Sequence, residues 1–416
     1  MINYNKSVSI LNKNKIIIGS EKIHSNDSLN RVCSKNVFSK VNYPAANNSA
    51  FDGFAIKSLD SKYASKRKEI KFKVLRVLAA GDKPKIKYKK CSCFEIMTGA
   101  IIPKPFDTII PVESAKIVKL KNSRFLFVNK RIKKNQYVRF YGSDFKKKQL
   151  IISKGEIINS SHILALKTLG FKNILVKRKP KILFFSTGNE ISENNNTPDW
   201  MVRNSNSYYV KSLSTNFLFN YYDGGLIKDN DERKFYNILK RKLKSKFDII
   251  ITSGAVSAGK FDFIPKIIKK FKTNGYFKGV SIRPGKPVLF AKFKSNNKSF
   301  FGLPGNPISS AACFRFFVYP YLQKILGVQL EKPLNAILKN SFVKKKNFTR
   351  FVKAKLSINK NNKLEVEILK GQESFKIKSF INSNVWAVLK DGKTQFKKGQ
   401  MIECYNSTIT NKFFLE

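Results

Sequence analysis

Three carboxylates lie in loops between apolar and helical segments of the chain and could together hold a divalent cation. Glu190 ends the stretch 186-STGNE-190, Asp229 precedes an amphipathic helical pattern, and Asp262 closes the glycine-containing stretch 252-TSGAVSAGKFDF-263. Mg²⁺ prefers oxygen ligands and commonly takes one or two carboxylates together with a substrate phosphate. The chain has 27 acidic residues against 81 basic ones, so an acid in each of three loops is informative. These residues predict a Mg²⁺ site at Glu190, Asp229 and Asp262.

The glycine-containing stretch is similar in spacing to a triphosphate-binding loop. Gly254, Gly259 and Lys260 match that motif, but Phe261 stands where a Ser or Thr hydroxyl would ligate Mg²⁺. A triphosphate loop is therefore not predicted. The glycines still allow a close approach of the backbone to an anion, and Ser257 adds a hydroxyl donor. We interpret the stretch as a phosphate-binding loop, with an ordinary glycine turn as the alternative.

A third loop, 302-GLPGNP-307, has the residues of a stiff turn from a strand into a helix. Asn306 is suited to cap a helix, and Pro307 at the first helical position loses no hydrogen bond. Such a turn directs free backbone N–H groups outward and favours anion binding. For any single loop a purely structural turn is the commoner explanation. Three such loops, which follow the apolar runs at 181–187, 247–253 and 299–303, together indicate a ligand-binding edge of a sheet.

Strand and helix patterns alternate in the middle of the chain. Strands are expected at 181–187, 247–253, 287–293 and 299–303, and helices at 207–221, 231–246 and 306–326. This alternation predicts a parallel, doubly wound α/β sheet with ligands at the carboxyl ends of its strands. Before about residue 180 the pattern is of short strands with one helix at 160–169. After about residue 330 it indicates a small β-barrel or sandwich.

The net charge of +54 has two explanations. One is a polyanionic partner such as nucleic acid, which would make the chain a basic binding or scaffold protein. The other is a compositional bias toward lysine, which we favour because the lysines are spread from end to end. No aromatic and basic module typical of RNA-binding proteins is present, so no nucleic-acid partner is expected. In either case the field attracts anionic substrates.

The remaining composition excludes several other classes. The five cysteines are scattered and form no C-x-x-C pair, and there are only two histidines, so neither a disulfide framework nor a zinc site is expected. No apolar run is long enough to span a bilayer, and the N-terminus lacks the layout of a signal peptide. We expect a cytoplasmic protein with no membrane partner.

Taken in order, these loops and several further stretches resemble the molybdopterin molybdenumtransferases of the MoeA type, which are related to the gephyrin E domain. The matching stretches are 48-NSAFDGFA-55, 96-IMTGA-100, Asp144, 186-STGNE-190, 253-SGAVSAG-259 with Asp262, 284-PGKP-287, 302-GLPGNP-307 and 371-GQES-374. Each match is modest alone, but together they are ordered over nearly the whole chain.

The resemblance implies a multidomain α/β protein. Its regions would be an elongated N-terminal domain (1–41 with 145–179), an inserted β-rich domain (42–144), a molybdopterin-binding α/β domain similar to MogA and MoaB (180–328) and a C-terminal β-barrel (329–416). It also implies a homodimer in which Asp52 and Thr98 face an active site shared between subunits. The molybdopterin adenylyltransferase is a further implied partner.

The implied reaction takes adenylylated molybdopterin and molybdate, releases AMP with the help of Mg²⁺, and leaves molybdenum on the pterin. A pterin adenylyltransferase is the alternative, and the additional N- and C-terminal domains argue against it. The implied roles are catalytic for Asp52, Thr98, Asp144 and Asp262, substrate-binding for Gly254, Ser257, Arg283, Lys286, Pro304, Asn306 and Ser374, and metal-binding for Glu190, Asp229 and Asp262.

The chain departs from the family pattern at several of these loops. The exchanged residues are Asn189 for Asp, Ala255 for Gly, Lys260 for an acid, Phe140 and Tyr141 for arginines, and Glu373 for Gly. Metal binding and the selection of molybdate are the properties that these exchanges are expected to affect.

Overall fold

The computed structural model describes residues 1–84, 87–194, 196–215, 218–257, 262–407 and 409. The chain forms two compact units, one made of residues 1–35, 154–163 and 172–416, the other of residues 36–153 and 164–171. The finer four-domain boundaries expected from the sequence stay a prediction. In the described residues no helix is both long and apolar enough to cross a membrane.

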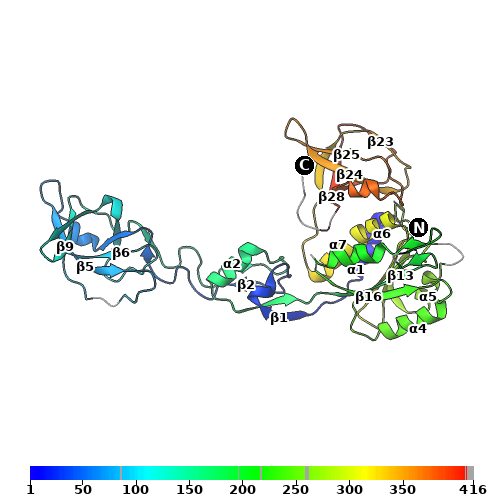
Figure 1. Cartoon of the computed structure of the whole chain (residues 1–416), viewed down its shortest axis with the longest axis horizontal. Helices are drawn as coiled ribbons and strands as arrows, with labels where there is room; N and C mark the ends of the chain where they lie inside the picture. The colour runs from blue at the N-terminus through cyan, green and yellow to red at the C-terminus, as the bar shows by residue number, and fades with distance from the viewer. Residues whose placement is uncertain (85–86, 195, 216–217, 258–261, 408, 410–416) are drawn as a thin grey trace. The chain divides into compact units, whose positions relative to one another are not determined.

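The larger unit is built on a six-stranded sheet (Figure 1). Its strands, in spatial order, are β16 (Asn220–Ile227), β13 (Lys181–Thr187), β17 (Ile249–Ser253), β21 (Ser299–Leu303), β20 (Leu289–Phe293) and β18 (Thr273–Lys278). The first four run parallel, as expected, but β20 and β18 are antiparallel to their neighbours. The expectation of parallel pairing for 287–293 was wrong because the short link from β20 to β21 leaves no room for a crossover helix.

Helices cover both faces of this sheet (Figure 1). One face packs against α1 (Tyr4–Lys13), α3 (Asn206–Thr215), α6 (Pro307–Cys313) and α7 (Tyr319–Leu326), and the other against α4 (Glu232–Lys242) and α5 (Ile264–Lys269). Ile182 and Phe184 of β13 are buried on the first face, and Leu183 and Phe185 on the second. This alternation is the two-residue period of a strand with both faces covered.

Two of the expected helices differ from the observed ones. The helix expected at 207–221 ends at Thr215, because Asn220 and Tyr221 pair with β13 as the start of β16. The helix expected at 306–326 begins as predicted, but a π-helical segment, Phe314–Val318, separates α6 from α7. Phe316 in that segment stacks on Phe351 of the C-terminal region, with ring centroids 3.8 Å apart.

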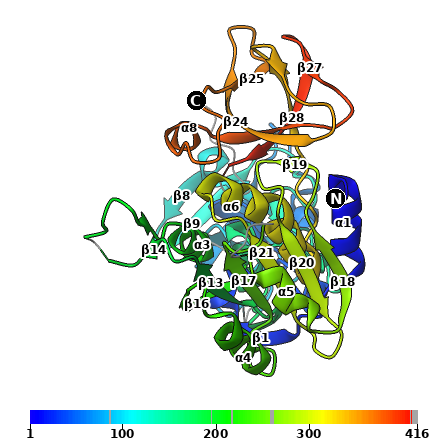
Figure 2. The ribbon, with the colours of Figure 1, turned by 90° about the vertical axis from the view of Figure 1, so that its right-hand side faces the viewer.

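The C-terminal region is a closed barrel (Figure 2), so of the barrel and the sandwich expected from the sequence the barrel is the one observed. Around the barrel run β24 (Thr349–Ile358), β25 (Leu364–Ile368), β22 (Leu334–Leu338), β28 (Met401–Asn406) and β26 (Val385–Leu389), and β26 pairs back to β24. Strand β19 (Ile282–Arg283) extends from the α/β region and pairs with β24. It therefore connects the carboxyl edge of the α/β region to the barrel.

The smaller unit contains a second six-stranded sheet, in agreement with a β-rich region. Its strands are β7 (Thr108–Pro111), β4 (Gly53–Ile56), β6 (Ser92–Ile96), β5 (Ile70–Leu78), β9 (Ser123–Val128) and β8 (Lys116–Leu120).

The remaining described elements of the two units are short. They are β1 (Ser20–His24), η1 (Ser25–Ser28), β2 (Val37–Phe38), β3 (Asn48–Ser49), η2 (Ser58–Ser61), η3 (Val112–Ser114), β10 (Val138–Arg139), β11 (Leu150–Ile152), α2 (Ser160–Thr168), β12 (Asn173–Lys177), β14 (Ile191–Ser192), β15 (Val202–Arg203), β23 (Phe342–Val343), α8 (Lys378–Ile381) and β27 (Gln395–Phe396).

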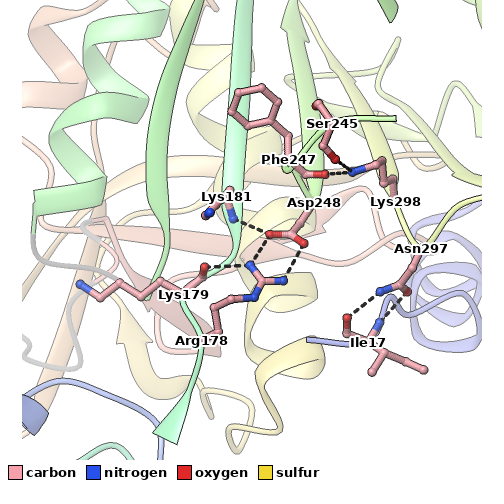
Figure 3. A network of polar contacts seen from close by, with 9 residues as sticks. All are labelled: Ile17, Arg178, Lys179, Lys181, Ser245, Phe247, Asp248, Asn297 and Lys298. Carbon is pink, nitrogen blue, oxygen red and sulfur yellow. Dashed lines mark hydrogen bonds and ion pairs between the residues drawn. The ribbon is translucent and has the colours of Figure 1, made fainter. Parts of the chain in front are cut away.

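Polar side chains close the amino edge of the α/β sheet, where β13, β17 and β21 begin (Figure 3). Arg178 donates two hydrogen bonds to the Asp248 carboxylate, at 2.7 and 2.8 Å, and the Lys181 N–H donates a third at 2.8 Å. Lys298 donates from Nζ to the Ser245 carbonyl at 2.6 Å and also to the Phe247 carbonyl. These contacts fix the starts of the strands whose opposite ends carry the site.

Candidate active site

Gly254 joins the three loops at the carboxyl edge of the sheet. Its N–H donates to the Leu303 carbonyl at 2.9 Å, and its φ of +104° lies in the region that favours glycine. A Cβ at this position would lie 2.3 Å from the Thr187 carbonyl oxygen. Only glycine therefore allows the loops after β13, β17 and β21 to approach each other this closely.

Asn206 connects two of these loops, those after β17 and β21, through its side chain, and the sequence did not predict it. Its Nδ2 donates to the Ser253 hydroxyl and to the Gly305 carbonyl, both at 2.7 Å, and Ser253 donates to the Pro304 carbonyl at 3.3 Å. The expected helix began one residue later, so Asn206 was not considered. The polar run 204-NSN-206 before a helix is the signal that could have indicated it.

The proposed phosphate-binding loop is only partly described. Ser257 is exposed, as a ligand-binding hydroxyl would need to be. Ala255 has a φ of +52°, in the left-handed region that favours glycine, which is the residue that the resemblance implies at this position. Gly259 and Lys260, which match a triphosphate loop, and Phe261, which departs from it, lie outside the described residues together with Ala258.

The three carboxylates expected to bind Mg²⁺ are not gathered into a ready-made site. Within the described part of the chain no three His, Cys, Asp or Glu side chains are arranged to hold a metal ion. Asp229 instead exchanges hydrogen bonds with Asn189: its N–H donates to Asn189 Oδ1 at 3.0 Å, and its Oδ2 accepts from the Asn189 N–H at 3.3 Å. This exchange joins the Asp229 and Glu190 loops, while Asp262 is half-buried beyond the undescribed residues.

A cationic hollow of about 490 Å³ lies beside the same edge. Its position follows from the pairing of Leu289 with Gly302, which brings the 284–287 loop next to the end of β21. The cations that line it are Arg283, Lys286, Lys344, Lys345 and Arg350. Of these, only Arg283 and Lys286 were predicted, because Lys344, Lys345 and Arg350 belong to the barrel and carry no recognisable motif.

Electrostatic repulsion inside the hollow favours an anionic ligand. Burial lowers the pKa of Arg350, and the charge of Arg283 lowers it further. An oxyanion between these two guanidinium groups would relieve their repulsion and accept their hydrogen bonds. We call this set of residues, with Ser309 and the 372–375 loop, the oxyanion hollow.

Ser374 and Asn306 connect the hollow to the loops around Gly254. The Asn306 amide donates from Nδ2 to the Ser374 hydroxyl at 3.2 Å, and the Ile308 N–H donates to the Ser374 carbonyl at 3.3 Å. Asn306 is the N-cap residue of α6, as predicted, but its side chain makes no capping hydrogen bond. Its backbone carbonyl accepts from Ser310 at 2.9 Å, while the side chain reaches the barrel instead.

In the smaller unit, Asp52 and Thr98 are in direct contact, while their place in an active site shared between subunits stays a prediction. The Asp52 carboxylate accepts from the Thr98 N–H at 2.6 Å and from the Thr98 hydroxyl at 2.8 Å. These bonds, the backbone one first, lower the pKa of Asp52, so it is ionised at neutral pH. Asp144 is exposed and its N–H donates to the Tyr43 carbonyl at 3.0 Å.

Comparisons with known proteins cover nearly the whole chain. Residues 2–170 match the MoeA N-terminal region (domain I and II), residues 184–324 match a family described as "Probable molybdopterin binding domain", and residues 335–406 match the MoeA C-terminal region (domain IV). A molybdopterin molybdenumtransferase of Staphylococcus aureus (strain Mu50) is 30% identical over 382 residues, covering 90% of this chain and 88% of that protein. The chain belongs to the molybdopterin molybdenumtransferase (MoeA) family.

Two further relatives of this MoeA-family chain agree over still more of its length. A molybdopterin molybdenumtransferase of Staphylococcus epidermidis is 29% identical over 405 residues, covering 97% of this chain and 94% of the relative. The crystal structure of the molybdopterin biosynthesis MoeA protein from Pyrococcus horikosii superposes with a TM-score of 0.83 at 25% identity, over 98% of this chain and 99% of that one. Both the loop set and the barrel therefore belong to the MoeA fold.

Proposed function

We propose that this enzyme transfers molybdenum from molybdate to adenylylated molybdopterin and releases AMP, in the biosynthesis of the molybdenum cofactor. Family membership over the whole chain supports this function. The observation in the structure that carries it is the oxyanion hollow, which five cationic residues line beside the loops around Gly254. Molybdate is a small oxyanion, and paired guanidinium and ammonium groups are suited to such a ligand.

The two parts of the carboxyl edge would divide the substrates between them. The loops around Gly254 offer backbone N–H groups and the Ser257 hydroxyl, which suit the phosphate of the pterin. Arg283, Lys286 and Arg350 of the hollow would hold molybdate. The hydrogen bond from Asn306 to Ser374 joins the two parts, so that the substrates would be held side by side.

Mg²⁺ is proposed as a requirement of the reaction, where it would polarise the pyrophosphate that is cleaved. Because Glu190, Asp229 and Asp262 do not form a cation site among themselves, its binding would also need oxygen atoms of the substrate. We also propose a cytoplasmic homodimer, in which Asp52, Thr98 and Asp144 of one subunit complete the site of the other. The molybdopterin adenylyltransferase is the proposed source of its substrate.

The test is AMP release from adenylylated molybdopterin by purified protein, with molybdate and Mg²⁺ each added and omitted. We expect AMP only when both are present. Asp262→Ala should abolish turnover at unchanged melting temperature, whereas Asp27→Ala, an exposed acid elsewhere, should not change it. Well-folded protein that releases no AMP while a known molybdenumtransferase does so would refute the proposal.

The two alternative functions are not favoured. A pterin adenylyltransferase would convert ATP and molybdopterin to adenylylated product, but the chain matches MoeA N- and C-terminal regions in addition to the pterin-binding domain. Nucleic-acid binding rests on the net charge alone. It would require a dependence of affinity on salt steeper than that of a generic polycation.

A further inference from the structure

Lys353 is a buried lysine whose ammonium group binds the backbone of one loop three times. It lies on β24 with 1% of its surface exposed. Its Nζ donates to the carbonyls of Gly371 at 2.6 Å, Lys376 at 3.0 Å and Glu373 at 3.2 Å. An ammonium group has three N–H donors, so all of them are used on this loop.

The backbone of Lys353 holds the same loop from a second direction. Its N–H donates to Gln372 Oε1 at 3.0 Å, and its carbonyl accepts from Gln372 Nε2 at 2.8 Å. Residues 371–376 are therefore wrapped around a single residue of the barrel wall. Within this loop, Ser374 is the residue that contacts Asn306 and Ile308 of the α/β region.

From this geometry we infer that Lys353 is a positioning residue for the oxyanion hollow: its ammonium group holds loop 371–376 so that Ser374 stays against Asn306 at the hollow's wall. The inference rests on the proposed function for the meaning of the hollow. Lys353 does not line the hollow itself, so it would act through the loop rather than on a substrate.

The barrel's other contribution to the hollow is held in the same way. Lys344 is 6% exposed, and its Nζ donates to the Phe348 carbonyl at 2.8 Å and to the Lys345 carbonyl at 3.3 Å. Both barrel loops that line the hollow are thus fixed by buried ammonium groups. A buried charge stabilises a fold poorly compared with an apolar residue, so we interpret these lysines as specifying loop geometry rather than adding stability.

The charge on Lys353 is sensitive to pH near neutrality. Burial lowers its pKa to about 8, Glu373 opposes this shift, and Lys376 and Arg350 add to it. On the adjacent strand β26, the residue that pairs with Lys353 is Trp386, which carries no charge. As the pH rises through about 8, the group therefore loses its charge and one of its three donors.

The first experiment compares Lys353→Met with Lys363→Met, which removes an exposed lysine of the same barrel. We expect the KM for molybdate to rise about tenfold in Lys353→Met, because three carbonyls of the loop lose their shared donor and the loop relaxes. The kcat should change less than about threefold, since no group at the reacting atoms is removed. Unchanged KM in a folded Lys353→Met protein would overturn the inference, as would an equal rise in Lys363→Met.

The second experiment does not depend on how well that variant folds. Trp386 is 1% exposed and Trp200 82% exposed, so Trp200→Phe leaves Trp386 as the single tryptophan, on the strand next to Lys353. We expect its fluorescence to change with an apparent pKa near 8 and the KM for molybdate to rise over the same pH range. A flat fluorescence profile from pH 7 to 10 in the Trp200→Phe protein overturns the inference.

The fluorescence arm separates the failure of this inference from failure of the proposed function. A protein without molybdenumtransferase activity refutes the function, while its Trp386 titration still reports on Lys353. Conversely, the enzyme could be active while its KM for molybdate does not change with pH as the Trp386 fluorescence does. That result would leave the proposed function standing and overturn the positioning role of Lys353. In Lys353→Met both transitions should be absent, and their persistence there would also overturn it.

Discussion

The two edges of the α/β sheet carry charge in opposite ways. At the amino edge, Asp248 is nearly buried and accepts from the Arg178 guanidinium twice and from the Lys181 N–H once (Figure 3). At the carboxyl edge, five cations line one hollow, with the single acid Glu373 among them. Among the described residues of that edge, glycine, amide and hydroxyl groups make the contacts between the loops.

This difference separates charges that serve the fold from charges that serve a ligand. Asp248 and Arg178 satisfy each other inside the protein, and this hydrogen-bonded pairing raises the pKa of Arg178. Arg350 faces the opposite situation, since burial and Arg283 both lower its pKa. A cation destabilised in the free protein can gain more from an incoming oxyanion than a cation that is already paired.

The largest effect is expected from Gly254→Ala at the carboxyl edge. The new Cβ would lie 2.3 Å from the Thr187 carbonyl, so the three loops must separate. A shift of about 1 Å in a substrate-holding loop costs about 100-fold in kcat/KM. Ala255→Gly, the opposite exchange one residue later, should keep full activity and raise the unfolding free energy by about 0.5 to 1 kcal/mol, because Gly tolerates the φ of +52° better. Equal kinetics of Gly254→Ala and the unmutated enzyme would contradict the role of this edge.

Asp248→Ala should have the reverse profile at the amino edge. Removing one partner of this pair leaves Arg178 and the Lys181 N–H without their acceptor, and because Arg178 is about one-third exposed we expect a loss of about 2 kcal/mol of unfolding free energy. Urea denaturation measures this loss. Arg178→Met in the same background should then cost little more, since the pair is already broken. At temperatures where the protein is folded, kcat/KM should stay within about threefold. A larger kinetic loss would show that the amino edge also serves the reaction.

The sequence predicted the local parts of both edges but not how they assemble. Strands 181–187 and 299–303 and the loops after 187, 253 and 303 were correct, because apolar runs and turn residues are local signals. The direction of β20 was wrong because strand polarity depends on the length of the connection, which the pattern of apolar residues does not report. Asn206 was missed for a similar reason. Its two acceptors lie 47 and 99 residues away in the chain, so nothing near it in sequence marks it as a bridge.

Of the barrel's share of the hollow, Ser374 was predicted as a substrate-binding residue, but the barrel's cations were not. Arg350 and Lys344 lie in strand and loop segments that look like any other basic stretch of a chain with 81 Lys and Arg residues. Only the pairing of β19 with β24 brings them beside Arg283. The Mg²⁺ site at Glu190, Asp229 and Asp262 stays a prediction, because the described residues contain no ready-made group of three ligands and oxygen atoms of the substrate would have to complete it.

The smallest effect, and the finest test of the comparison, is expected from Glu373→Gln. Glu373 stands where the resemblance to the family implies Gly. Its negative charge at the hollow would repel an oxyanion, whereas Asp248 at the amino edge lies away from the proposed ligand. Because Glu373 is exposed and forms only a 3.4 Å ion pair with Lys376, we expect the KM for molybdate to fall by about twofold, and by less at high salt. Glu373 also raises the pKa of Lys353, so its removal should move the high-pH rise in KM to lower pH. Steady-state kinetics against pH measure both effects, with Glu365→Gln on β25 as the control of equal charge. A KM that rises in Glu373→Gln would mean that this carboxylate helps to bind the substrate, and the hollow would then differ from the amino edge less than its charges indicate.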